Sequence, residues 1–99
     1  MISLLENQTI NGSSIVTKLD TDKSTRDDIS AQRVIVGAGS FAGATITITV
    51  SGNGVDFAPL ASNTFTTPTV KGENLPSELF IKAEVTGATG TTDVSLHVA

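Results

Sequence analysis

The sequence predicts an all-β fold: a small antiparallel β-sandwich or jelly-roll-like domain of about seven short strands. Two segments, Gly43 to Leu60 and Leu79 to Val98, each hold a strand of strict apolar–polar alternation, a short Gly-rich turn and the start of a second strand. A period of two places one row of side chains on the core face and the other in water. Turn signals recur about every ten residues, and no long helical period occurs.

The chain is the size of one domain and has a light core. It has 99 residues, with four Phe and neither Trp nor Tyr. A chain of this length buries roughly two thirds of its unfolded surface, which is enough for one thin core. We expect residues 1–12 to form an N-terminal arm or edge strand and residues 13–99 to form a single β-sandwich domain.

The first half of the chain is expected to alternate short strands with polar turns. Thr and Ser suit the wet face of strands, and an Asn11-Gly12 pair indicates a turn. The expected elements are a short strand at Ser14–Leu19, a polar loop at Asp20–Ser30 with room for one helical turn, a buried strand at Arg33–Val36 and a turn at Gly37–Gly43.

The second half carries the stronger strand signals. Gly52-Asn53-Gly54 tolerates positive φ and therefore favours a tight hairpin. Prolines at positions 59 and 68 indicate edges or strand ends. The expected strands are Ala44–Val50, Asp56–Leu60 and Thr64–Val70, then, after a loop at Lys71–Glu78, a final hairpin of Leu79–Thr86 and Thr92–Val98 joined by Gly87–Gly90.

Charge and composition argue against several partners. The net charge is −4, and the six Lys and Arg residues are scattered, so we expect no binding to nucleic acid or to membranes. The chain has no cysteine, which excludes disulfides and thiolate metal sites and fits assembly in a reducing cytoplasm. The N-terminus lacks the features of a signal peptide, and no segment is long enough to span a membrane.

One glycine-rich segment superficially matches a dinucleotide-binding turn. Gly37, Gly39 and Ala42 have the GxGxxA spacing. That motif requires a helix that begins at the glycines and faces the pyrophosphate. Here the glycines lead into an alternating β segment, so a plain β-turn is the better interpretation and no cofactor is expected.

An acidic loop resembles part of a calcium loop. Asp20, Asp22, Ser24 and Asp28 fall at the first, third, fifth and ninth positions of an EF-hand-like pattern. Position six is not Gly, position twelve is not Glu, and no helices flank the loop. A solvated acidic loop is preferred, with a weak cation site left open.

The remaining polar candidates indicate no catalysis. His97 is the single histidine and is expected on the polar face of the last strand, too far from Asp93 to pair with it. Asn7 and Asn11 begin glycosylation acceptor patterns, interpreted as accidents of a Thr- and Ser-rich chain. We expect a protein that is not an enzyme.

The order of elements resembles a family of small structural proteins of tailed bacteriophages. The similarity covers Phe41–Leu60 and Leu75–Val98, roughly half the chain: a Gly-rich turn, a strand of the type GATVTVQVS, a D/N-G turn with an aromatic, a Pro-Leu strand end, and a closing segment of the type LRAxVTGATGTTxVxVxV. The opening LLENQTINGSS is also similar. Val55-Asp56-Phe57 departs from the usual Asn-Trp, and Lys82 from the usual Arg.

This resemblance implies a virion protein assembled in the host cytoplasm. The expected function is a capsid decoration (cement) protein that binds the outer surface of the major capsid protein shell and stabilises it. Self-association is also expected, with a trimer plausible. Because Ile2, Leu4 and Leu5 lie on a segment without a hairpin partner, we expect an arm that contacts a neighbouring subunit by strand addition.

Alternatives stay open at this point. One is a neck-, tail- or fibre-associated β-domain. Another is a carbohydrate- or receptor-binding module that uses loops Gly52–Asp56 and Gly87–Thr91, although sugar sites normally use Trp or Tyr. A host-encoded adhesin is disfavoured by the lack of a signal sequence.

Overall fold

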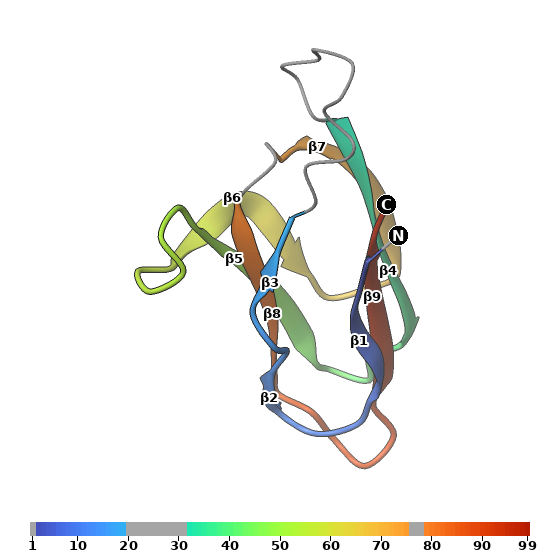
Figure 1. The fold of residues 1–99 in the computed structure, drawn as a ribbon. Coiled ribbons are helices and arrows are strands. Elements are labelled where there is room, and N and C mark those ends of the chain that lie inside the picture. Colours follow the sequence, from blue (N-terminus) through green and yellow to red (C-terminus); the bar gives the residue numbers. More distant parts are fainter. Residues whose placement is uncertain (1, 20–31, 76–78) are drawn as a thin grey trace.

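The protein is a β-sandwich of two antiparallel sheets, as the alternation predicted (Figure 1). The computed structural model describes residues 2–19, 32–75 and 79–99. These residues form nine strands, two of them only two residues long. The strands are β1 (Ile2–Gln8), β2 (Gly12–Ser13), β3 (Thr17–Lys18), β4 (Gln32–Ser40), β5 (Thr45–Ser51), β6 (Ala58–Phe65), β7 (Thr69–Asn74), β8 (Phe80–Thr86) and β9 (Asp93–Val98).

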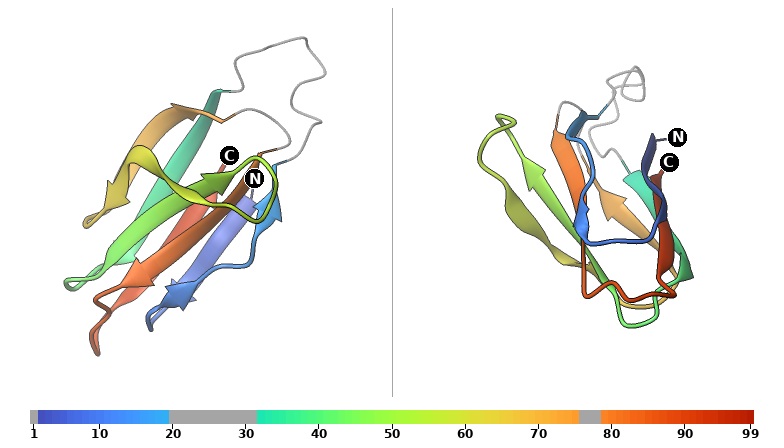
Figure 2. Two further views of the ribbon diagram at one scale, coloured as in Figure 1. Left: turned by 90° about the vertical axis from the view of Figure 1, so that its left-hand side faces the viewer. Right: turned by 90° about the horizontal axis from the view of Figure 1, so that it is seen from below.

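The first sheet has the order β1-β9-β4-β7, and the second has the order β2-β8-β5-β6, with β3 also pairing with β8 (Figure 2). The longest regular pairing in the second sheet joins β5 to β8, from Thr45 opposite Thr86 to Ser51 opposite Phe80. In the first sheet Ile2 lies opposite Val98, so the two ends of the chain are side by side.

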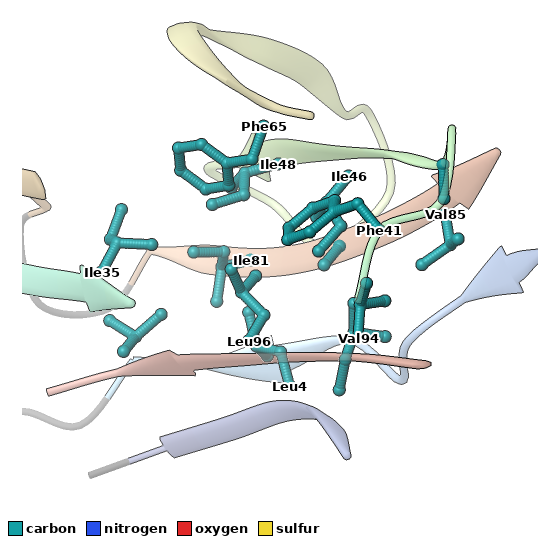
Figure 3. Packing of buried hydrophobic residues seen from close by; sticks show 14 of the residues in the cluster. Leu4, Ile35, Phe41, Ile46, Ile48, Phe65, Ile81, Val85, Val94 and Leu96 are labelled. Carbon is teal, nitrogen blue, oxygen red and sulfur yellow. The ribbon is translucent and has the colours of Figure 1, made fainter. Parts of the chain in front are cut away.

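The core lies between the sheets and is built by the alternating rows (Figure 3). Ile46 and Ile48 come from β5, and Val94 and Leu96 come from β9. All four side chains are completely buried. The intervening residues of these strands face outward, which confirms the predicted period of two. Each buried Leu or Ile side chain contributes about 1.5–3 kcal/mol of transfer free energy to folding.

Two expected elements at the chain's end are confirmed as strands, but they do not form a hairpin. β8 belongs to the second sheet and β9 to the first, so residues 87–92 form an arch between the sheets. Thr92 stabilises the arch: its N–H bonds the carbonyl of Thr89, and its Oγ1 accepts from the N–H of Thr89. Alternation alone does not distinguish these geometries, because both place an apolar row on the core.

Strand β4 continues through a segment that was expected to be a turn. β4 runs through both Gly37 and Gly39, and of these two only Gly39 has a positive φ. A Cβ on Gly37 would already touch the side chains of Leu96 and Phe65 at 3.6 Å. At Gly39, with φ of +105°, a Cβ would lie 2.2 Å from the carbonyl oxygen of Asp93. Gly39 therefore permits the close approach of β4 to β9, whereas a Cβ at Gly37 would make only ordinary van der Waals contacts.

The region between residues 56 and 74 is divided differently from the expectation. One strand, β6, runs through the expected break near Asn63, and the turn falls at residues 66–68. β7 then continues to Asn74, into the expected loop. A register shift opposite β5 and a positive φ of 63° at Ser62 let β6 bend and continue.

Of the expected strand at residues 14–19 only Thr17 and Lys18 form a strand, β3, and the short strand β2 precedes it where a turn was expected. β2 and β3 pair with β8 on either side of Ser14, whose N–H bonds the carbonyl of Ala83 over 2.7 Å. The Ser14 hydroxyl in turn accepts from the N–H of Ala83. The segment therefore stays attached to β8, although it is not one continuous strand.

Of the two expectations for the start of the chain, an edge strand is confirmed for residues 2–8, and an arm without a partner in its own chain is wrong. Residues 2–8 form β1, an edge strand of the first sheet that pairs with β9. Two register shifts in this pairing let the consecutive residues Leu4 and Leu5 both face the core, where they are 7% and 3% exposed. Ile2 packs against the same core. The leucine side chains are therefore unavailable to a neighbouring subunit while β1 stays in place.

Candidate interaction surface

Two sequence motifs suggested small-molecule or metal chemistry, and the described residues include the glycine-rich one. Gly37 and Gly39 lie in strand β4 and Ala42 in the turn that follows, so no helix N-terminus faces this segment. Residues 20–28, with the acidic pattern, lie outside the described residues. Among the residues that are described, no three His, Asp or Glu side chains are grouped so that they could hold a metal ion.

His97 lies on the outer face of β9, opposite Ser3 of β1 and Val36 of β4. The outward position was predicted from the buried Leu96 beside it. Its Nδ1 atom is buried against the sheet and has no hydrogen-bond partner within the described ranges. Asp93 lies opposite Ser40, farther along the strand.

The two asparagines of the acceptor patterns are structural. Asn7 occupies the left-handed region, with φ of 51°, within β1. The Oδ1 of Asn11 accepts a hydrogen bond from the N–H of Ala88 over 2.8 Å. Asn11 therefore fastens the β1–β2 connection to the arch.

The loop at residues 52–57 is held by a network of side-chain hydrogen bonds. The Oδ1 of Asn53 accepts from the N–H groups of Val55 and Asp56 at 2.8 and 2.9 Å. The Ser51 hydroxyl, almost buried, accepts from the N–H of Gly54 and donates to the same Asn53 oxygen. These bonds satisfy backbone N–H groups of the loop that would otherwise bond to water. In this loop conformation the Val55 side chain is 78% exposed.

Beside this loop, the outer face of the second sheet carries two stacked lysine–phenylalanine pairs. The Nζ of Lys82 lies 4.6 Å from the centre of the Phe57 ring, and the Nζ of Lys18 lies 5.7 Å from that of Phe80. Both distances are within the range of cation–π attraction. We call these four residues the lysine–phenylalanine face.

The loop and this face are joined directly. A Cβ on Gly54 would lie 3.4 Å from the Phe80 ring, so the loop folds over that ring. Together they form a surface on which Val55 and Lys18 are exposed and Phe57, Phe80 and Lys82 are half-buried, on a protein whose net charge is negative. This combination suits contact with another protein, because aromatic side chains supply area and lysines supply orientation.

A second polar cluster closes the lateral side of the sandwich between β6 and β7. The Nδ2 of Asn63 donates to Oε2 of Glu73 over 2.9 Å, and Nζ of Lys71 donates to the carbonyl of Ser62 over 2.6 Å. The bond from Asn63, and next that from the N–H of Asn74, lower the pKa of Glu73 below its ordinary value of 4.5. This cluster ties the sheets together.

The two loops considered for receptor binding do not meet. Residues 52–57 follow Ser51, which pairs with Phe80 at the start of β8, whereas residues 87–92 follow the other end of that strand. The loops therefore lie at opposite ends of the sandwich. A receptor site built from both is inconsistent with this arrangement.

Sequence reasoning identified the turn with its aromatic but missed the lysine–phenylalanine face. The available signal was the outward row that holds Phe80 and Lys82. It did not reveal Phe57 as a neighbour of Lys82, because that contact depends on how the loop re-enters β6.

Comparison with known protein families, curated protein sequences and solved structures finds no match to this chain. No helix in the described part of the chain is long and apolar enough to span a membrane.

Proposed function

We propose that this chain is a non-enzymatic structural protein of a tailed-phage virion, and specifically a capsid decoration protein that binds the outer surface of the major capsid protein shell. The proposal rests on the resemblance of residues 41–60 and 75–98 to such proteins. The two segments contain strands β5 and β8, which pair directly over seven consecutive positions in the second sheet, and strand β9 of the first sheet. The resemblance therefore includes strands of both sheets.

The contact with the shell is assigned to the 52–57 loop and the lysine–phenylalanine face. A loop already held by the side chains of Ser51 and Asn53 loses little conformational freedom on binding. Val55 is exposed at its tip, and the flanking Phe57 and Phe80 add aromatic area. This assignment replaces the N-terminal arm, whose leucines are buried in the core.

The first experiment counts copies of the chain in purified particles produced by the genome that encodes it. Quantitative mass spectrometry against the major capsid protein gives the ratio. A decoration protein is expected at a copy number comparable to that of the shell protein. A copy number of only a few per particle would indicate a position in the neck, tail or fibres. Absence of the chain from the particles would overturn the virion proposal.

A matched pair of variants tests the assigned contact. Val55→Asp places a charge at the tip of the loop without touching the core, and we expect it to reduce the copies retained on particles. Ile10→Asp is the control, because Ile10 is similarly exposed, at 69%, in the connection after β1. Equal retention of the two variants would contradict the assignment of the contact to the loop.

A further inference from the structure

The edges of the two sheets differ in how well they could accept another strand. β1 is interrupted by two register shifts, and β6 carries one shift and Pro59. β2 and β3, on the edge beside β8, are two residues long each. Irregular, short or proline-containing edges resist pairing with another chain. Within the described residues, the remaining edge is β7, which pairs with β4 alone and without a shift over six positions.

The hydrogen bonds of β4 show which groups of β7 face the open edge. Val34 and Ala99 exchange both backbone bonds, at 3.3 and 2.8 Å, so the backbone groups of Val34 face β9. Those of Arg33 and Ile35 therefore face β7, because successive residues of a strand bond to opposite sides. Their register partners in β7 face back toward β4.

It follows that the N–H and C=O groups of Val70, Gly72 and Asn74 face away from β4. The side chain of the neighbouring Glu73 accepts the N–H of Asn74 over 3.1 Å, as expected for a group without a strand partner on that side. Val70 is 69% exposed on the outer face of the same strand. A regular edge with outward-facing peptide groups and an exposed Val suits strand addition.

We infer that β7 pairs with β7 of a second copy of this chain, in an antiparallel arrangement with a two-fold axis at Gly72. In this register Gly72 lies opposite Gly72 of the second copy, where the outward groups form a hydrogen-bonded pair. Lys71 then lies opposite Glu73 of the second copy, and Glu73 lies opposite its Lys71. Opposite charges directly across two strands stabilise pairing, and here the strand is complementary to itself.

Both charged groups already have hydrogen bonds within one copy, Lys71 to the carbonyl of Ser62 and Glu73 from the amide of Asn63, and the cross-strand contacts add to these bonds. The side chains of Lys71 and Glu73 are 26% and 27% exposed and lie 4.0 Å apart within one copy. Each copy contributes one Lys and one Glu, so the contact is neutral in charge despite the acidic chain. The inference does not depend on the proposed function, because it uses only the edge and its register.

The test combines sedimentation velocity with amide hydrogen exchange on the full chain. We expect a monomer–dimer equilibrium that shifts to dimer as protein concentration rises, with exchange at Gly72 slowing in parallel. A chain that stays monomeric at every accessible concentration would overturn the inference. So would a dimer in which the Gly72 amide exchanges as fast as in the monomer.

Charge reversal provides the specific control. Lys71→Glu places glutamates opposite each other at both cross-strand positions, and we expect dimerisation to weaken roughly tenfold or more. The double variant Lys71→Glu/Glu73→Lys restores opposite charges across the axis and should recover the dimer. Lys82→Glu makes the same charge change on the second sheet and should leave the dimer intact. Failure of the double variant to recover, with a native circular dichroism spectrum, would contradict the register.

Discussion

The hydroxyl group of Thr92 donates a hydrogen bond of 3.0 Å to the backbone carbonyl of Phe41, 51 residues earlier in the chain. Thr92 is 2% exposed, and Phe41 lies in the connection between β4 and β5. The bond therefore joins the arch between β8 and β9 to the connection between β4 and β5, which also crosses from one sheet to the other. The hydroxyl of Thr89 strengthens this junction by donating to the carbonyl of Ala42 over 3.0 Å.

Thr92→Val should destabilise the protein by about 1–3 kcal/mol, because it removes two hydrogen bonds of a buried hydroxyl, one to the carbonyl of Phe41 and one from the N–H of Thr89. Thr91→Val is the matched control, since Thr91 is exposed one residue earlier and should change stability little. Urea unfolding of both variants measures the difference. Equal stabilities would show that the Thr92 hydroxyl does not stabilise the arch.

Gly39→Ala should destabilise the protein by roughly 2 kcal/mol or more, because the added Cβ meets the carbonyl of Asp93 and the φ of +105° is strained for alanine. Gly90→Ala, where a Cβ would meet nothing within 4 Å, should stay within about 0.5 kcal/mol of the parent. Thermal unfolding distinguishes the two. A Gly39→Ala protein of unchanged stability would contradict the close approach of β4 and β9.

Leu5→Ala should cost about 2–5 kcal/mol of unfolding free energy, since a buried leucine leaves a cavity when truncated. Glu6→Ala, at the next and exposed position of β1, is the control. This experiment distinguishes a core strand from a free arm. An arm would tolerate both substitutions equally.

The carboxyl group of Glu73 gives a prediction for pH. Its pKa is lowered in the folded protein, chiefly by the hydrogen bond from Asn63, so its ionised form stabilises the fold above pH 4.5. This contribution should be lost as the pH falls below 4.5 through the lowered pKa. Asn63→Ala should raise the pKa of Glu73, as measured by NMR titration of its carboxyl carbon. If the titration of Glu73 were unchanged in this variant, Asn63 would not be the principal cause of the lowered pKa.

The fold class was predictable because each strongly alternating segment has one apolar row of side chains. Turning such a strand over would expose that row to water, so the row must face the core. Ile46, Ile48 and Leu96 are buried as their spacing required. The pairing partners were not predictable in the same way. Whether β8 and β9 form a hairpin or an arch depends on hydrogen bonds made by Thr92 and Asn11 to distant parts of the chain.

The candidate surface was predictable only in part. The turn around Asn53 has a clear local signature, because its side chain bonds its own loop. The pairing of Lys82 with Phe57 and the open edge at β7 depend on sheet order. A single sequence does not encode sheet order in any local pattern. The burial of Leu4 and Leu5 was missed for the same reason, since their partner strand is the last one.

The pairing of β1 with β9 also determines when the domain can be completed during synthesis. Of the nine described strands β1 is synthesised before the others, and its partner β9 is synthesised after them. Leu4 and Leu5 must therefore remain in solvent while the rest of this sequence is translated, and the first sheet closes only near the end. Sheets that depend on such distant pairings fold slowly, over milliseconds to seconds, and expose apolar surface to aggregation meanwhile. Protection of nascent β1 is therefore expected to limit the yield of folded protein.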